Sequence, residues 1–146
     1  MGSMGRGRVP GKPAREPGVE VPKVINAINL MIEHRPDLAL TDSQFVRVLS
    51  IKRALDSTNA PLLRRVDSVA RLFKNAPLFS QPTSQRRDSL AAGQALVRET
   101  MADVDDNIAD AREKAYALLS STQLTKAEQI EDQARKAGAS PARGRL

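Results

Sequence analysis

The amino-acid sequence predicts an all-α protein: a long antiparallel helical hairpin with short flanking helices, which we expect to dimerise. Two long stretches repeat apolar residues in steps of three and four, a spacing that places them on one side of a helix. Hydrophobic residues make up 40% of the chain but aromatic residues only 3%. The core is therefore expected to consist of small aliphatic side chains, which suit packed helices better than sheets. No stretch is a strong candidate for a strand.

The sequence divides into a helical hairpin domain at 23–137 and two basic tails. Residues 1–22 contain four prolines and five glycines and almost no apolar side chains, a composition that cannot offset the entropy of ordering, so we expect a flexible tail. Residues 138–146 have the same character. The net charge of +6 comes from the two ends of the chain, and residues 24–134 sum to about zero. The basic pI therefore does not indicate a globally basic, nucleic-acid-binding surface.

A first short helix is expected from Val24 to His34 or Arg35. Pro36 should end it, because the residue before a proline is pushed out of the helical region. Its apolar residues follow helical spacing: Val24, Ala27, Ile28, Met31 and Ile32.

The second helix opens with a complete start signal, Leu40-Thr41-Asp42-Ser43-Gln44-Phe45. Thr41 has the position of an N-cap, and Gln44 can reach back to it, which makes a capping box. Leu40 and Phe45 occupy the two positions of a hydrophobic staple. This segment therefore predicts where the first long helix begins.

An apolar stripe continues along the second helix to Phe73, and only Asn59 interrupts it. Pro61 lacks the backbone N–H of a helix interior, so we expect a kink near 57–60 and not an end. The stripe comprises Val48, Ile51, Leu55, Leu62, Val66, Val69 and Phe73.

The residues from Asn75 to Pro82 predict the turn of the hairpin, and the second long helix should begin at Thr83 or Ser84. Its stripe alternates steps of four and three, the heptad pattern of antiparallel bundles. A second capping box, Thr125 with Glu128, predicts a short last helix that Gly138 stops after about Lys136. The stripe comprises Leu90, Gln94, Val97, Met101, Val104, Ile108, Ala111, Ala115 and Leu118.

The two long helices differ in charge. Residues 47–87 carry nine basic and two acidic side chains, whereas 88–134 carry ten acidic and four basic ones. Antiparallel pairing would set these charges against each other, which favours mutual electrostatic support. The alternative is a basic face on the first long helix that is left for acidic or unfolded partners.

The residue types argue against an enzyme and against a cofactor. The chain has no Cys and one His, His34, whose place near a helix end suits capping better than metal ligation. Four aspartates fall close together, but a helix face without a loop cannot wrap an ion, so no metal site is expected: Asp103, Asp105, Asp106 and Asp110. No phosphate-binding loop, specific nucleic-acid motif or apolar run long enough to enter a membrane is found.

The segment Leu40-Thr41-Asp42-Ser43-Gln44 resembles the Leu-Thr-x-x-Gln motif of the Spy/CpxP family of periplasmic chaperones and stress sensors. Family members carry this motif twice, and here the second copy is identified as Leu124-Thr125-Lys126-Ala127-Glu128-Gln129. It departs from the family pattern, because Glu128 stands where the family has Gln. The resemblance in layout covers about residues 24–137.

The resemblance implies an ATP-independent chaperone-like or stress-response protein, a homodimer of hairpins that holds unfolded clients in a helical cradle. The alternatives are a structural or adaptor hairpin with one specific protein partner, and a metal-responsive periplasmic sensor, against which the single His argues. The expected location is the periplasm if a leader has been removed, and otherwise the cytoplasm. The implied client-binding residues, which a merely solvated face would also explain, are Arg47, Lys52, Arg53, Arg64, Arg65 and Arg71.

Overall fold

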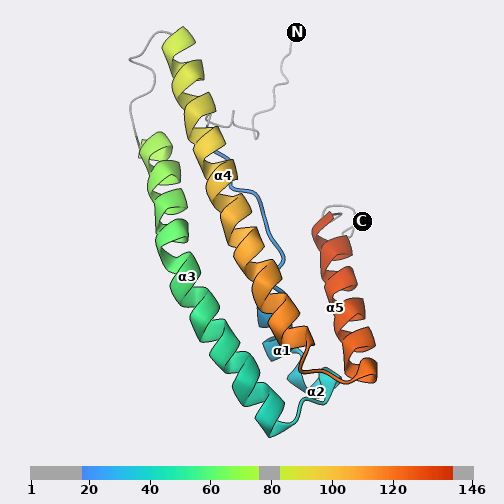
Figure 1. The fold of residues 1–146 in the computed structure, drawn as a ribbon. Helices are drawn as coiled ribbons and strands as arrows, with labels where there is room; N and C mark the ends of the chain where they lie inside the picture. The colour runs from blue at the N-terminus through green and yellow to red at the C-terminus, as the bar shows by residue number, and fades with distance from the viewer. Residues whose placement is uncertain (1–17, 76–82, 140–146) are drawn as a thin grey trace, which may run out of the picture.

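The computed structural model describes residues 18–75 and 83–139, and the regular secondary structure of this part of the chain is entirely α-helical (Figure 1). Two helices of 34 residues each, α3 and α4, run antiparallel as a hairpin, which confirms the predicted fold class. The shorter helices gather at the end of the hairpin opposite the α3–α4 turn. The helices are α1 (Ala27–Glu33), α2 (Arg35–Leu38), α3 (Asp42–Asn75), α4 (Thr83–Tyr116) and α5 (Ser121–Ala139).

The two predicted apolar stripes form the core between α3 and α4. Six members of the α4 stripe are buried, and three members of the α3 stripe are buried opposite them. Ile28 and Met31 of α1 and Ile130 of α5 complete the same core, so one side of the hairpin is covered by the short helices. The buried stripe residues are Val48, Leu55, Val66, Val97, Met101, Val104, Ile108, Ala111 and Ala115.

Asn59, the apparent interruption of the α3 stripe, has a partner across the hairpin. Its side chain is only 4% exposed, and its Oδ1 accepts a hydrogen bond of 2.8 Å from Nδ2 of Asn107. A buried amide without a partner is costly, so a register that separated these residues would be penalised. The pair therefore helps to fix how α3 and α4 align.

Helix α3 passes through Pro61 without ending, as the sequence predicts. The proline removes the helical partner of the Ser57 carbonyl. Both Ser57 and Pro61 are exposed, so water can bond that carbonyl. In Figure 1 the helix curves gently along its length.

The first predicted helix is wrong at both ends. It begins at Ala27, because Asn26 caps it: the Asn26 side chain accepts from the N–H of Ile28 at 3.0 Å and of Asn29 at 3.2 Å. It ends at Glu33, and Pro36 falls in the first turn of the separate helix α2, where a missing N–H costs nothing.

The predicted start of the last helix is also wrong. Helix α5 begins at Ser121, and its capping box is Ser120 with Gln123. The Gln123 N–H donates to Ser120 Oγ at 3.2 Å, and the Ser120 N–H donates to Gln123 Oε1 at 2.9 Å. Thr125 lies inside the helix, where its hydroxyl bonds the Ser121 carbonyl. Two start signals overlap here, and the earlier one begins the helix.

Gly138 does not stop α5, which continues to Ala139. The predicted turn falls on 76–82, and the predicted tails fall mainly on 1–17 and 140–146; these three segments lie outside the described residues. Residues 18–22, placed in the first tail by their composition, have an extended backbone beside α4 (Figure 1).

Gly93 lets α4 lie close to the ring of Phe73 on α3. A Cβ at this position would clash with Cε2 and Cζ of that ring, so the ring or the helices would have to shift. We therefore expect Gly93→Ala to lower the free energy of unfolding by about 1–3 kcal/mol through overpacking, although alanine is the better helix former. Chemical denaturation followed by circular dichroism measures this.

Gly138→Ala is the matched control, because nothing lies within 4 Å of its added Cβ and the same exchange should be neutral or stabilising by up to about 1 kcal/mol. In a Phe73→Leu background Gly93→Ala should lose most of its cost. Equal effects of the two alanine substitutions in the natural background would contradict this account.

Candidate functional site

The two capping boxes meet at the base of the hairpin. The box of α3 is Thr41 with Gln44, as predicted: the Gln44 N–H donates to Thr41 Oγ1 at 3.1 Å, and the Thr41 N–H donates to Gln44 Oε1 at 2.9 Å. The box of α5, Ser120 with Gln123, repeats this geometry. Leu40 and Leu119 stand directly before the two boxes.

The two box glutamines also bond to each other. Gln44 Nε2 donates to Gln123 Oε1 at 2.9 Å, and Gln123 Nε2 donates to Gln44 Oε1 at 3.0 Å. Each amide then uses its remaining donor on the other segment: Gln44 on the Leu118 carbonyl at 2.8 Å, Gln123 on the carbonyls of Leu38 and Ala39 at 3.2 and 3.1 Å. We call Gln44 and Gln123 the glutamine clasp. It joins the α2–α3 turn to the α4–α5 turn.

The clasp brings together two segments of similar sequence. Leu119-Ser120-Ser121-Thr122-Gln123 has the same pattern as Leu40-Thr41-Asp42-Ser43-Gln44 if Ser replaces Thr as the cap, a change that N-caps tolerate well. Leu124, Thr125 and Glu128, named from the sequence as the second copy, form no capping box. The sequence signal that could have located this capping box is Gln123 itself, three residues after Ser120.

The clasp predicts that replacing Gln123 with glutamate lowers the stability of the fold. Gln123→Glu keeps the oxygen that bonds the Ser120 N–H but removes both N–H donors, so the carbonyls of Leu38 and Ala39 lose their partner. We expect the free energy of unfolding to fall by about 1–3 kcal/mol, measured by urea denaturation. Gln129→Glu, on an exposed position of α5, is the control and should change stability little. A cost no larger than that of the control would mean that the clasp does not stabilise the fold.

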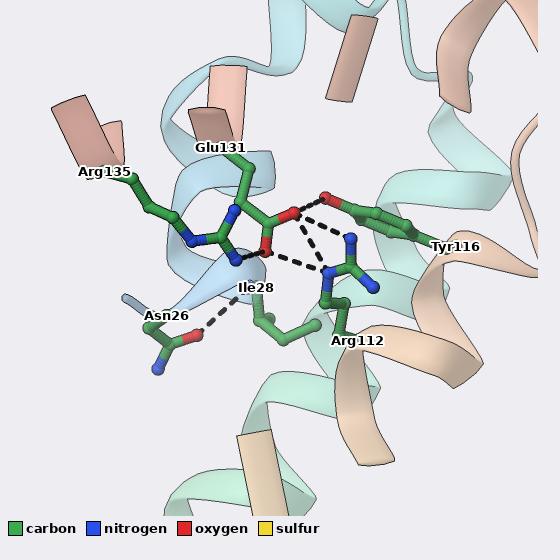
Figure 2. Close-up of polar contacts among 6 residues, drawn as sticks. All are labelled: Asn26, Ile28, Arg112, Tyr116, Glu131 and Arg135. Atoms are coloured by element: carbon green, nitrogen blue, oxygen red, sulfur yellow. Dashed lines mark hydrogen bonds and ion pairs between the residues drawn. The ribbon is translucent and has the colours of Figure 1, made fainter. Parts of the chain in front are cut away.

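Helix α5 is fixed to α4 by a buried carboxylate, that of Glu131 (Figure 2). Glu131 is 4% exposed and accepts from Arg112 through Nε at 2.9 and 3.1 Å and Nη2 at 2.8 Å. Tyr116 donates its hydroxyl at 3.3 Å, and Arg135 lies 3.5 Å away. The Arg112 guanidinium also lies 4.4 Å from the centre of the Tyr116 ring. A carboxylate so fully bonded has a structural role and is not free for chemistry.

These contacts shift two pKa values upward. The hydrogen bonds to Glu131 raise the pKa of the Arg112 guanidinium. Burial raises the pKa of the Tyr116 phenol to about 12, and the neighbouring Glu131 carboxylate adds to this shift. Both shifts favour the pair of a charged arginine and a neutral tyrosine around the carboxylate.

The Tyr116 shift is directly measurable, because the chain has one Tyr and no Trp. In the folded protein we expect the phenol to ionise near pH 12, followed by the near-ultraviolet absorbance of tyrosinate. In the unfolded chain the tyrosine ionises near pH 10. Its contribution to the free energy of unfolding is therefore fully present below pH 10 and is lost as the pH rises toward 12. Glu131→Gln should lower the folded midpoint, and Tyr116→Phe should remove this part of the pH dependence. A midpoint near 10 in the folded protein would refute the buried environment.

The other side of the hairpin carries a hollow of about 280 Å³ between α3 and α4. No residue of α1, α2 or α5 lines it. Apolar and polar groups share its wall, with Asp110 and Lys114 at its α4 edge. The lining residues are Ser50, Ile51, Ala54, Leu55, Thr58, Asn107, Asp110, Ala111 and Lys114.

Residues spaced by seven extend this surface along the hairpin, because seven residues return to nearly the same side of a helix. Leu72 is 62% exposed and Leu96 is 38% exposed, so the surface holds two large apolar side chains in contact with water. We define the open face by its residues: Ile51, Thr58, Arg65 and Leu72 on α3, and Leu96, Asp103 and Asp110 on α4.

The six predicted client-binding residues all lie on α3 but do not share one side of it. Arg65 belongs to the open face, and Arg47, eighteen residues or five helical turns earlier, lies on the same side. Arg53, Arg64 and Arg71 are spaced by eleven and seven residues and lie on the outer side of α3.

Two of the six have acidic partners within their own helix. Lys52 pairs with Asp56 at 2.8 Å, and Arg71 pairs with Asp67. The four others make no ion pair with any residue of 18–75 or 83–139: Arg47, Arg53, Arg64 and Arg65. The site predicted as one basic face is therefore two surfaces.

Other candidate chemistry finds no support in the described parts of the chain. His34 bonds Asp37 at 3.0 Å, next to the end of α1. Within 18–75 and 83–139, no three His, Cys, Asp or Glu side chains are grouped to hold a metal ion. None of the described helices is long and apolar enough to cross a membrane.

Comparison with known proteins returned no matching family model, no matching curated protein and no matching solved structure.

Proposed function

We propose that this protein is an ATP-independent, chaperone-like binding protein that holds unfolded polypeptide segments on the open face of its hairpin. The observation that carries the proposal is the unequal treatment of the two sides of the hairpin. Helices α1 and α5 pack against one side of the hairpin, at the end away from the α3–α4 turn. None of the short helices lines the hollow on the other side, and Leu72 and Leu96 are exposed farther along that face. Exposed apolar side chains among polar and charged ones are typical of an interaction surface.

The chemistry of the open face suits clients without a fixed structure. Arg47 and Arg65 offer positive charge on the α3 side, and Asp103 and Asp110 offer negative charge on the α4 side. The hollow between them is shallow and of mixed polarity, so it accepts small apolar side chains without selecting one shape. Weak contacts of several kinds favour broad recognition over one tight partner.

The paired capping boxes support the same proposal. The second box, Ser120 with Gln123, has a glutamine at the same position as Gln44 in the first box. Two such segments, each at the start of a helix, resemble the paired Leu-Thr-x-x-Gln motifs of the Spy/CpxP family, although Ser120 stands where the family has Thr. We extend the proposal accordingly to a homodimeric cradle, without catalytic activity or cofactor, that acts in the periplasm as part of a stress response.

The proposal predicts that the protein suppresses aggregation of a chemically unfolded model client without ATP, followed by light scattering. Suppression should weaken at higher salt, because part of the attraction is between exposed charges. The double variant Arg47→Glu/Arg65→Glu should raise the concentration needed for half-suppression by at least about threefold. Sedimentation should show a dimer.

The matched control is Arg53→Glu/Arg64→Glu, which makes the same charge change on the outer side of the same helix and should leave suppression nearly unchanged. Equal losses in the two double variants would show that net charge, and not the open face, determines binding. Absence of suppression at several-fold excess of the natural protein would refute the chaperone function and favour an adaptor hairpin with one specific partner.

A further inference from the structure

The chain before α1 lies on the hairpin in an extended conformation. Residues 18–26 contain no helix and run beside α4 toward α1 (Figure 1). Val19 and Val24 are partly buried and pack against the core, while the residues between them are exposed. We call residues 18–22 the strap.

One side chain of α4 holds the strap by its backbone. The Glu20 N–H donates to Gln94 Oε1 at 2.8 Å, and Gln94 Nε2 donates to the Glu20 carbonyl at 2.7 Å. The primary amide thus bonds both backbone groups of one residue, as a neighbouring strand would. The Glu20 side chain takes no part in either bond, so any residue except proline could occupy this position.

The strap does not fill the surface around Gln94. A hollow of about 390 Å³ lies beside it, lined by Glu20, Val21, Pro22, Gln94 and Arg98. Val21 is 43% exposed, so the strap buries little apolar area beyond Val19. A segment held by two hydrogen bonds and one partly buried valine is easily displaced.

We propose that Gln94 is a second binding point for extended polypeptide, that the strap occupies it as a resident ligand, and that a client segment replaces the strap. The inference rests on the proposed function, because the incoming segment is one of the unfolded clients. Arg98, one helical turn beyond Gln94, lines the same hollow, and its positive charge favours a segment that carries a carboxylate. The site therefore takes extended segments that carry a carboxylate and have no proline at the position bonded by Gln94.

The first test measures the strap itself in the unaltered chain. Hydrogen exchange should show the Glu20 amide protected, and Gln94→Met, which keeps the side-chain volume but removes both bonding groups, should abolish that protection. Glu99→Met, at an exposed position of α4 that does not line this hollow, is the control and should leave it. A Glu20 amide that exchanges equally fast in all three proteins would overturn the resident-ligand assignment.

The second test offers the strap as a separate ligand. A fluorescent peptide with the sequence of residues 17–25 is titrated into the full-length protein, into Val19→Asp and into Val19→Asp/Gln94→Met, with anisotropy as the readout. Val19→Asp loosens the resident strap, so it should bind the peptide at least about fivefold more tightly than the natural protein. The double variant should lose that gain, and a peptide with proline at the Glu20 position should not bind. Circular dichroism and thermal unfolding verify that each variant is folded.

The two proposals fail in different ways. Peptide binding as expected, without suppression of client aggregation by the natural protein, would refute the chaperone function and leave the Gln94 site standing. Suppression of aggregation by the natural protein, with no peptide bound to folded Val19→Asp or with equal binding to both variants, would overturn the Gln94 site and leave the chaperone function standing. If both hold, Val19→Asp should also suppress aggregation at lower concentration than the natural protein.

Discussion

The pairing of Gln44 with Gln123 is the interaction on which the remainder of the structure depends. Each amide satisfies its own helix start, its partner amide and a turn carbonyl of the opposite segment. The pair thereby ties the base of α3 to the start of α5, and α1 and α5 are kept on one side of the hairpin. Among the described residues, Ala39 is the one non-glycine residue with a left-handed backbone, φ 53°. Its carbonyl accepts a hydrogen bond from Gln123, which helps to stabilise this strained conformation.

A consequence of this arrangement is that polar side chains fix positions and apolar ones supply the stability. Asn59 with Asn107 aligns the long helices, Arg112 with Glu131 holds α5, and Gln94 holds the strap. Each is a specific pair whose separation leaves a polar group without a partner. The apolar core alone would tolerate sliding by a helical turn.

Features that depend on residues close together in the sequence could be predicted, whereas contacts between residues far apart in the sequence could not. The capping box of α3 and the α4 stripe depend on residues within one or two turns, so periodicity and capping rules were enough. The start of α5 was misplaced because Thr125 with Glu128 obeys the same rules as Ser120 with Gln123, and only the bond to Gln44 decides between them. Of the predicted client-binding residues, Arg47 and Arg65 alone share the open face, because helix spacing does not tell which side the short helices cover.

The separation of the clasp residues along the chain also determines how the molecule unfolds. Gln44 and Gln123 are 79 positions apart, and closing so long a loop in an unfolded chain is entropically expensive. Once α3 and α4 pair, the loop that remains is about ten residues, which lowers that cost by roughly 2 kcal/mol. By the same amount, a formed clasp stabilises the paired helices. Hairpin and clasp therefore stabilise each other, and loss of either weakens the other by about this amount.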